Sequence, residues 1–195
     1  QALKIKPDYA EAYNNMGSSL QFKGDLEAAI DSYTQALDIK PDFAEAYNNM
    51  GSALKDQGDL EAAINSYKRA ITIKPDYAEA YHYLSSITKY DERTQHVTQM
   101  QSLHKDKNIT EKQRCHFSFA LAKVFEDLND LDQSFSYLEL GNSLRRNKLN
   151  YNIKKDIKFF DLLKNTYPLF KGLAPTTLEV ESDIKPIFIL GMPRS

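Results

Sequence analysis

One segment of this 195-residue chain recurs at a fixed interval. Lys6–Gly17 returns almost letter for letter as Lys40–Gly51, and its first eight residues return as Lys74–Tyr81. The prolines of the first two copies, Pro7 and Pro41, stand 34 residues apart. A period of this length indicates that one structural unit is built several times and stacked, because a single copy cannot bury its apolar face.

Small and large residues within each copy predict a pair of closely packed helices. Gly17 and Ala29 have little or no side chain, so two helices can approach closely there, and Tyr33 can fill the space around the contact. Gly24 and Asp25 suit a turn and the N-cap of the second helix. The equivalent positions of the next copy hold the same residue types: Gly51, Ala63, Tyr67, Gly58 and Asp59.

Other residues predict where helices begin. An Asp-x-x-Glu pattern, which can form a capping box, opens the first helix of each copy. The pairs are Asp8 with Glu11, Asp42 with Glu45, and Asp76 with Glu79. Thr110 with Gln113 predicts a cap for a later helix.

These features resemble the tetratricopeptide repeat (TPR) family. The signature positions of two copies are filled by Tyr13, Met16, Gly17, Leu20, Ala29, Tyr33, Ala36 and Pro41, and by Tyr47, Met50, Gly51, Leu54, Ala63, Tyr67, Ala70 and Pro75. The resemblance implies an all-α fold of helical hairpins stacked in a right-handed superhelix. Repeats are expected at residues 10–43, 44–77 and 78–111, after a partial repeat at residues 1–9 that suggests further repeats upstream.

The pattern weakens along the chain. In the third copy, Ser85 replaces the glycine and Val97 replaces the packing alanine. A degenerate fourth copy is expected from Cys115 to Lys148, in which Asn129 takes the place of the turn glycine. A further amphipathic helix is expected from about Ile153 to Tyr167. Together these two elements define a region of degenerate repeat and connecting helix at residues 112–172.

The last residues differ in character from the repeats. Residues 173–186 have no period and are expected to form a linker. Ile187–Leu190 is a short β-branched and aromatic run between Pro186 and Gly191, which predicts one C-terminal strand from an incomplete α/β domain.

This strand and the residues after it, Pro193, Arg194 and Ser195, resemble the start of a sulfotransferase domain at residues 187–195. In that family the loop binds the 5′-phosphate of 3′-phosphoadenosine 5′-phosphosulfate (PAPS). The whole chain is similar to bacterial TPR-sulfotransferases of the tyrosylprotein-sulfotransferase type. The resemblance implies that this chain holds no catalytic residue and no cofactor of its own, and that PAPS is the co-substrate of the parent enzyme.

Paired asparagines in the repeats are candidate binding residues. Asn15 and Asn49 are equivalent, and Asn14 and Asn48 precede them. Their position resembles the asparagine ladder of O-GlcNAc transferase, which implies a protein or peptide partner in the concave groove. The alternative is that these amides only solvate the inner face. The lysine-rich clamp for chaperone tails is absent from the expected groove positions, which argues against a chaperone adaptor.

Composition excludes other classes of function. The net charge of −2 argues against a nucleic-acid partner, and no apolar run is long enough to span a membrane. Cys115 is the only cysteine, so no internal disulfide can form. The histidines show no metal-ligand spacing, so no metal site is expected. A cytoplasmic location is expected.

Three functions remain open at this point. The first is the protein-binding scaffold and linker of a PAPS-dependent sulfotransferase. The second is a stand-alone TPR interaction scaffold, and the third is the repeat arm of a glycosyltransferase similar to O-GlcNAc transferase. The sequence that follows Ser195 in the gene would separate them.

Overall fold

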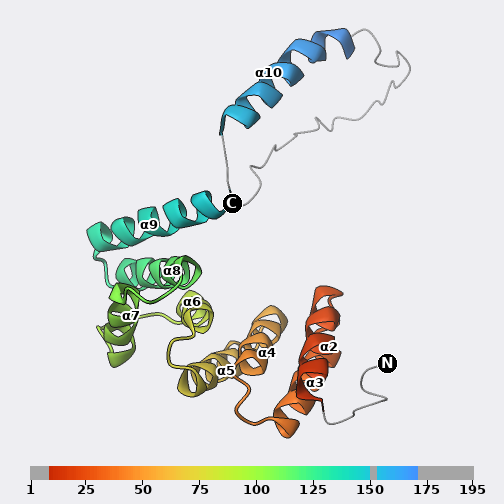
Figure 1. Cartoon of the computed structure of the whole chain (residues 1–195), viewed down its shortest axis with the longest axis vertical. Coiled ribbons are helices and arrows are strands. Elements are labelled where there is room, and N and C mark those ends of the chain that lie inside the picture. Colours follow the sequence, from red (N-terminus) through yellow and green to blue (C-terminus); the bar gives the residue numbers. More distant parts are fainter. Residues whose placement is uncertain (1–8, 150–152, 171–195) are drawn as a thin grey trace, which may run out of the picture. The chain divides into compact units, whose positions relative to one another are not determined.

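The computed structural model describes residues 9–149 and 153–170. Within these ranges the chain forms nine helices and no strand, which confirms the all-α prediction (Figure 1). The helices are α2 (Ala10–Phe22), α3 (Leu26–Ile39), α4 (Ala44–Gln57), α5 (Leu60–Ile73), α6 (Ala78–Ile87), α7 (Gln95–Lys105), α8 (Glu111–Asp127), α9 (Leu131–Leu149) and α10 (Ile153–Phe170). The chain divides into two units, residues 1–150 and 151–195.

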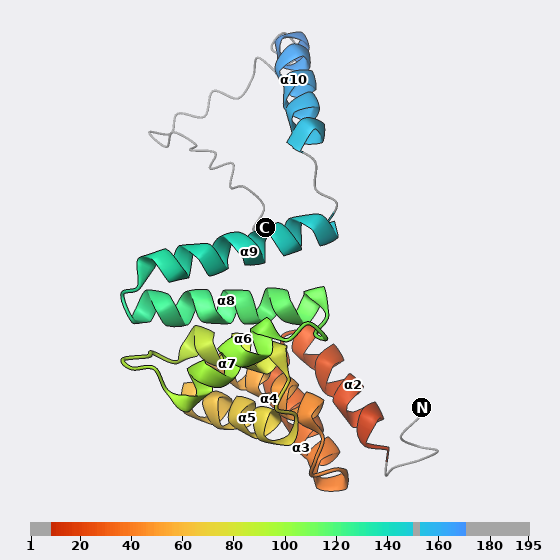
Figure 2. The ribbon, with the colours of Figure 1, turned by 60° about the vertical axis from the view of Figure 1, so that its left-hand side comes forward.

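Within the first unit, helices pair along the chain and the pairs stack. Helix α2 packs against α3, α4 against α5, and α8 against α9. Figure 2 shows α8 and α9 lying side by side along their length. Successive pairs meet where α3 contacts α4 and α5 contacts α6. For the first two repeats this is the arrangement that the 34-residue period predicts, whereas α6 and α7 each pack against α8.

The glycine–tyrosine contact of each early hairpin confirms the predicted close approach. A Cβ atom added at Gly17 would lie 2.6 Å from Cε1 of Tyr33, and one added at Gly51 would lie 2.8 Å from Cε1 of Tyr67. Both tyrosines are fully buried. Any side chain at either glycine would therefore force the two helices apart.

The predicted turns between paired helices are also confirmed. Gly58 has a φ of 96°, in the left-handed region that glycine adopts without strain. Asp59 follows it as the N-cap of α5, and its Oδ1 accepts a hydrogen bond from the Ala62 backbone N–H at 3.0 Å. Asn129 takes the same role before α9, with a φ of 57°. Asn is among the few other residues that tolerate this conformation.

The first helices begin differently from the prediction. The N-caps of α4 and α6 are Phe43 and Tyr77, and neither helix has a side-chain cap. Asp42 lies one residue too early, because the backbone turns there: the Phe43 N–H donates to the Lys40 carbonyl at 3.2 Å. The Asp-x-x-Glu capping boxes of α4 and α6 were thus wrong, and Asp8 lies outside the described residues.

The cap predicted for α8 is present. Oγ1 of Thr110 accepts from the Gln113 backbone N–H at 3.2 Å, and Oε1 of Gln113 accepts from the Thr110 backbone N–H at 2.9 Å. The two groups form a complete capping box.

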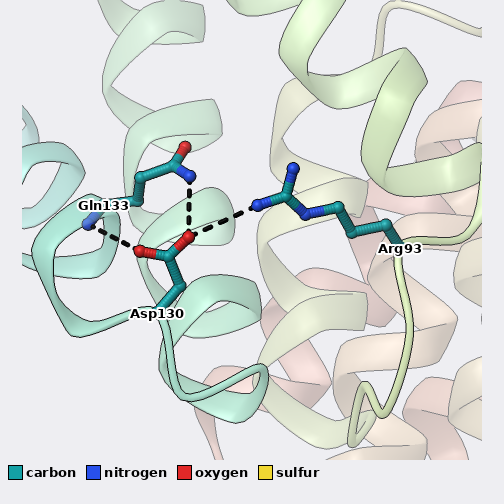
Figure 3. Close-up of polar contacts among 3 residues, drawn as sticks. All are labelled: Arg93, Asp130 and Gln133. Carbon is teal, nitrogen blue, oxygen red and sulfur yellow. Dashed lines mark hydrogen bonds and ion pairs between the residues drawn. The ribbon is translucent and has the colours of Figure 1, made fainter.

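The loop between α6 and α7 is held by the turn between α8 and α9. Nη2 of Arg93 in this loop lies 3.3 Å from Oδ2 of Asp130, which also accepts from Nε2 of Gln133 at 2.7 Å (Figure 3). The Tyr90 backbone N–H donates to Oδ2 of Asp127 at 3.3 Å. These contacts with the turn between α8 and α9 therefore hold the loop between α6 and α7. The loop has no turn glycine equivalent to Gly24 and Gly58.

Buried side chains form two clusters. The smaller cluster contains Ala29, Tyr33 and Ala53 between the first two hairpins. The larger cluster extends from α5 to α8, and its largest fully buried members are Tyr67, Tyr81, Leu84, Val97, Met100, Phe117, Leu121, Val124 and Phe125. The degenerate copies therefore hold most of the core.

In the second unit, the structure describes only helix α10. It begins at Ile153 as expected and continues to Phe170, so it includes Pro168, beyond the end expected at Tyr167. The predicted linker at residues 173–186 and the predicted strand Ile187–Leu190 lie outside the described residues.

Candidate functional site

A pocket of about 440 Å³ lies along α2, α4 and α6. We call it the polar pocket. Its lining residues come from these three helices, with one tyrosine from α3: Ser18, Gln21, Phe22, Tyr33, Asn48, Asn49, Ser52, Asp56, Glu79 and Tyr83. Most of these side chains carry hydrogen-bonding groups, so the surface can meet the polar groups of a ligand.

A hydrogen-bonded chain in this pocket joins two hairpins. The Tyr33 hydroxyl donates to Oε1 of Gln21 at 3.1 Å. Nε2 of Gln21 donates to Oγ of Ser52 at 3.1 Å and to Oδ2 of Asp56 at 2.9 Å. These bonds fix the direction of the Gln21 amide and of the Asp56 carboxylate before any ligand arrives.

The predicted asparagines occupy three different environments. Asn14 is buried, and its Oδ1 accepts from Nδ2 of Asn49 at 3.0 Å. Asn48 is also buried, and its Oδ1 has no hydrogen-bond partner among the described residues. Asn48 and Asn49 line the polar pocket, whereas Asn15 is exposed and does not line it. The structure thus brings Asn14, Asn48 and Asn49 together and leaves Asn15 apart from them.

Several pocket residues were missed by the sequence analysis. Gln21, Asp56 and Glu79 all line the polar pocket. A usable signal was present for Asp56, because Ser52 and Asp56 follow Asn49 at intervals of three and seven residues, which place all three on one helix face. The pattern of paired asparagines by itself does not extend along α4 to Asp56.

A second pocket of about 410 Å³ lies between the start of α6 and the start of α8. Its lining residues include acids, bases and one histidine: Glu45, Lys74, Asp76, Tyr77, Ala78, Glu79, Thr110, Lys112, Gln113 and His116. The Glu79 carboxylate forms an ion pair with Lys112, and its Oε1 lies 3.5 Å from Nε2 of His116. Glu79 lines both pockets, so the two are neighbours.

Two histidine rings stand beside this junction. The ring centroids of His82 and His116 are 5.6 Å apart, and the centroids of His82 and Phe119 are 5.9 Å apart. Burial first, and then the charges of His116, Lys55 and Arg145, lower the pKa of His82 to about 4, against the opposing effect of Glu79. Burial also lowers the pKa of His116, against the opposing effect of Glu79. Both imidazoles are therefore neutral at pH 7.

Neither a metal-binding cluster nor a membrane-spanning helix is found among the described residues. No group of three or more His, Cys, Asp or Glu side chains among the described residues could hold a metal ion. In the same part of the chain, no helix combines the length and the apolar character that spanning a membrane requires. Pro193, Arg194 and Ser195 lie outside the described residues, so their assignment to a phosphosulfate loop stays a prediction.

Comparison with known proteins identifies the repeat class. Residues 23–58 and 51–85 each match the family model of the TPR repeat. The chain therefore contains TPR repeats, as its period predicted. A search of curated proteins finds no match.

Solved TPR structures share the fold. The crystal structure of MamA is 24% identical, with a TM-score of 0.54, over 77% of this chain and 86% of that one. YrrB, whose crystal structure is described as that of a TPR protein with an unusual peptide-binding site, is 19% identical, with a TM-score of 0.54, over 73% of this chain and 72% of that one. At these identities the likeness establishes the fold of stacked helical hairpins.

Proposed function

We propose that this chain is a scaffold that binds an extended segment of another protein in the polar pocket. The observation that carries the proposal is a pocket lined by amide, hydroxyl and carboxylate groups, one of which, Oδ1 of Asn48, has no partner among the described residues. An extended peptide presents a backbone donor and acceptor at every residue, and such groups need partners when they leave water. The peptide-binding site described for YrrB supports the same use of the shared fold.

The spacing along α4 suits an extended chain. Asn49, Ser52 and Asp56 lie on one face of the helix, and the rise from the first to the last is about 10 Å. An extended peptide covers that distance in about three residues. The three side chains can therefore contact neighbouring backbone groups of one segment, while the aromatic ring of Tyr83 provides an apolar wall.

Substitution of Asn49 tests the proposed contact. We expect Asn49→Ala to weaken the binding of a peptide selected from an array by about fivefold, the effect of one net hydrogen bond of about 1 kcal/mol. Fluorescence anisotropy with the labelled peptide measures the change. Asn65→Ala is the matched control, because Asn65 is exposed on α5, away from the pocket.

Thermal unfolding of both variants separates binding from stability, since Asn49 also bonds to Asn14. Asn15→Ala tests the ladder hypothesis at the equivalent exposed position. Unchanged peptide affinity in both Asn15→Ala and Asn49→Ala would leave these amides as solvating groups only.

A second proposal links the scaffold to sulfuryl transfer. It is supported by the order of Ile187–Leu190 and Pro193–Ser195, a strand-like run followed by a basic loop of the kind that binds anions. In a chain extended beyond Ser195, Arg194→Ala should weaken binding of 3′-phosphoadenosine 5′-phosphate by about tenfold to a hundredfold, because a charge-assisted contact is lost. Calorimetry measures this change, and equal affinity in the two proteins would remove Arg194 from the site.

A further inference from the structure

We propose that the patch of cations beside the His82 and His116 rings receives an acidic segment of the polypeptide that occupies the polar pocket. We call it the basic patch, and it consists of Lys55 of α4, Lys112 of α8, and Arg145 and Lys148 of α9. This inference rests on the proposed function and adds the chemical class of the partner. It is carried by the placement and the balance of charges around the two rings.

The packing of α8 against α9 positions two of these cations, Arg145 and Lys148. Gly141 of α9 allows a close approach to α8, because a Cβ atom there would lie 3.1 Å from Cε1 of Phe119. Sγ of Cys115 lies 3.5 Å from the Gly141 carbonyl oxygen. Arg145 and Lys148 follow Gly141 by four and seven residues, so they lie on the same face of α9. The packing that brings the helices together thus directs both cations to the side of α8 that carries His116.

The charges around the two rings are strongly unbalanced. Lys55 and Arg145 act on His82, and Lys112, Arg145 and Lys148 act on His116. Glu79 is the one acid among the described residues that acts on either ring. It is already paired with Lys112. At pH 7 the four cations and this carboxylate leave three net positive charges beside two neutral rings.

Other acids lie at one end of the patch. Glu45 and Asp76 line the second pocket together with Lys74, Lys112 and His116. The ion pairs of the described residues include none between an acid and Lys55, Arg145 or Lys148. These three cations are available to an external carboxylate.

The basic patch continues directly from the polar pocket. Nζ of Lys55 lies 5.6 Å from the centre of the Tyr83 ring, and Tyr83 lines the polar pocket. One extended segment can therefore contact both, with neutral residues in the pocket and acidic residues at the patch.

A polypeptide fits this surface better than a nucleic acid does. The polar pocket contains Asp56 and Glu79, which repel a chain with a phosphate at every nucleotide. A peptide can place its carboxylates opposite the patch alone. We therefore expect selectivity for acidic peptides over an oligonucleotide.

The test uses the full chain and three fluorescent probes: a peptide with a neutral Ser-rich half and an acidic Glu-rich half, the same peptide with Gln for Glu, and an oligothymidylate. We expect the Glu peptide to bind about tenfold more tightly than the Gln peptide at low salt, with the difference shrinking as salt screens the charges. The double variant Arg145→Gln, Lys148→Gln should reduce Glu-peptide affinity by about threefold to tenfold and leave Gln-peptide affinity unchanged. The control Lys68→Gln, Lys89→Gln removes the same charge from exposed positions elsewhere and should leave both affinities unchanged.

Each other outcome has a definite meaning. Equal affinity for the two peptides would overturn the acidic-segment inference while leaving the proposed peptide-binding function intact. No binding of either peptide would overturn both. If oligothymidylate binds as tightly as the Glu peptide and loses affinity in the Arg145, Lys148 double variant, the patch is a nucleic-acid site and the inference is wrong. Equal Glu-peptide affinity in the double variant and the wild type would place the acidic segment elsewhere.

Discussion

At the scale of single residues, glycines and alanines at the helix contacts determine how closely the helices pack. Gly51 faces Tyr67, and Ala63 lies fully buried on the same helix as that tyrosine. Such contacts were predictable from the sequence, because the need for a small residue is local and recurs in each copy. The burial of Asn48 and the pairing of Asn49 with Asn14 were not predictable in this way, since they depend on how neighbouring hairpins stack.

Enlarging the buried alanine should destabilise the hairpin. We expect Ala63→Leu to lower the free energy of unfolding by about 1–3 kcal/mol, because the packed interior cannot accommodate the added atoms without strain. Urea denaturation followed by circular dichroism measures the change. Lys68→Leu adds a leucine at an exposed position of the same helix and should have little effect. Equal stability of the wild type and Ala63→Leu would show that the alanine contact is not tightly packed.

The half-buried histidine His82 predicts a loss of stability in acid. Its pKa in the folded chain is about 4, below the ordinary value of 6.5. Between these two pH values the unfolded chain therefore binds a proton that the folded chain does not bind. The free energy of unfolding contributed by this group is therefore constant above about 6.5 and falls as the pH drops from 6.5 toward 4. In urea titrations over this range, His82→Asn should show a shallower decline than the wild type. Parallel pH dependences in the two proteins would contradict the shift.

At the scale of the elements, the two helices of the early repeats begin by different means. The second helices α3 and α5 have an aspartate cap after a left-handed glycine, whereas the first helices α4 and α6 begin after an aromatic N-cap without a side-chain bond. The sequence pattern was correct for the former because Gly-Asp specifies both the turn and the cap. It was wrong for the latter because Asp42 and Asp76 lie in the preceding turn.

This contrast gives a matched pair of substitutions. Asp59→Ala should cost about 0.5–2 kcal/mol of stability, because the Ala62 N–H loses its partner. Asp42→Ala should change stability by less than about 0.5 kcal/mol, since Asp42 is exposed and caps nothing. Chemical denaturation of both variants measures these two changes in stability. A loss at position 42 as large as that at position 59 would show that Asp42 does act as a cap in solution.

At the scale of the first unit, the core is unevenly distributed. The cluster between the first two hairpins is small, whereas the cluster from α5 to α8 contains most of the large buried side chains. The sequence showed the repeats most clearly where the core is smallest. In the larger cluster it indicated the signature residues Ala63, Tyr67 and Ala70. It gave no indication of Phe117 and Met100, which follow no repeat signature and are buried by contacts distant in the chain.

Amide hydrogen exchange should reveal this asymmetry. Repeat proteins are held by each hairpin and its immediate neighbours, so local opening follows local burial. We expect amides of α2 and α3 to exchange faster than those of α6 and α8, as measured by mass spectrometry of peptic peptides. Ala29→Leu should raise exchange further in α2 and α3 and leave α8 unchanged. Uniform exchange across the four helices would show that the first unit unfolds as a single cooperative block.

A last consequence follows from the hydrogen bonds of Gln21. Its equivalent in the next repeat is Lys55, 34 residues later, which lies over Tyr83 instead of bonding to a serine and a carboxylate. Identical repeats would let a bound chain slide by one unit at no cost. Here such a step exchanges an amide for an ammonium group, so sliding by one repeat would mismatch the charges of any ligand that fits. The two nearly identical copies therefore differ at the position that can define a unique register for a bound chain.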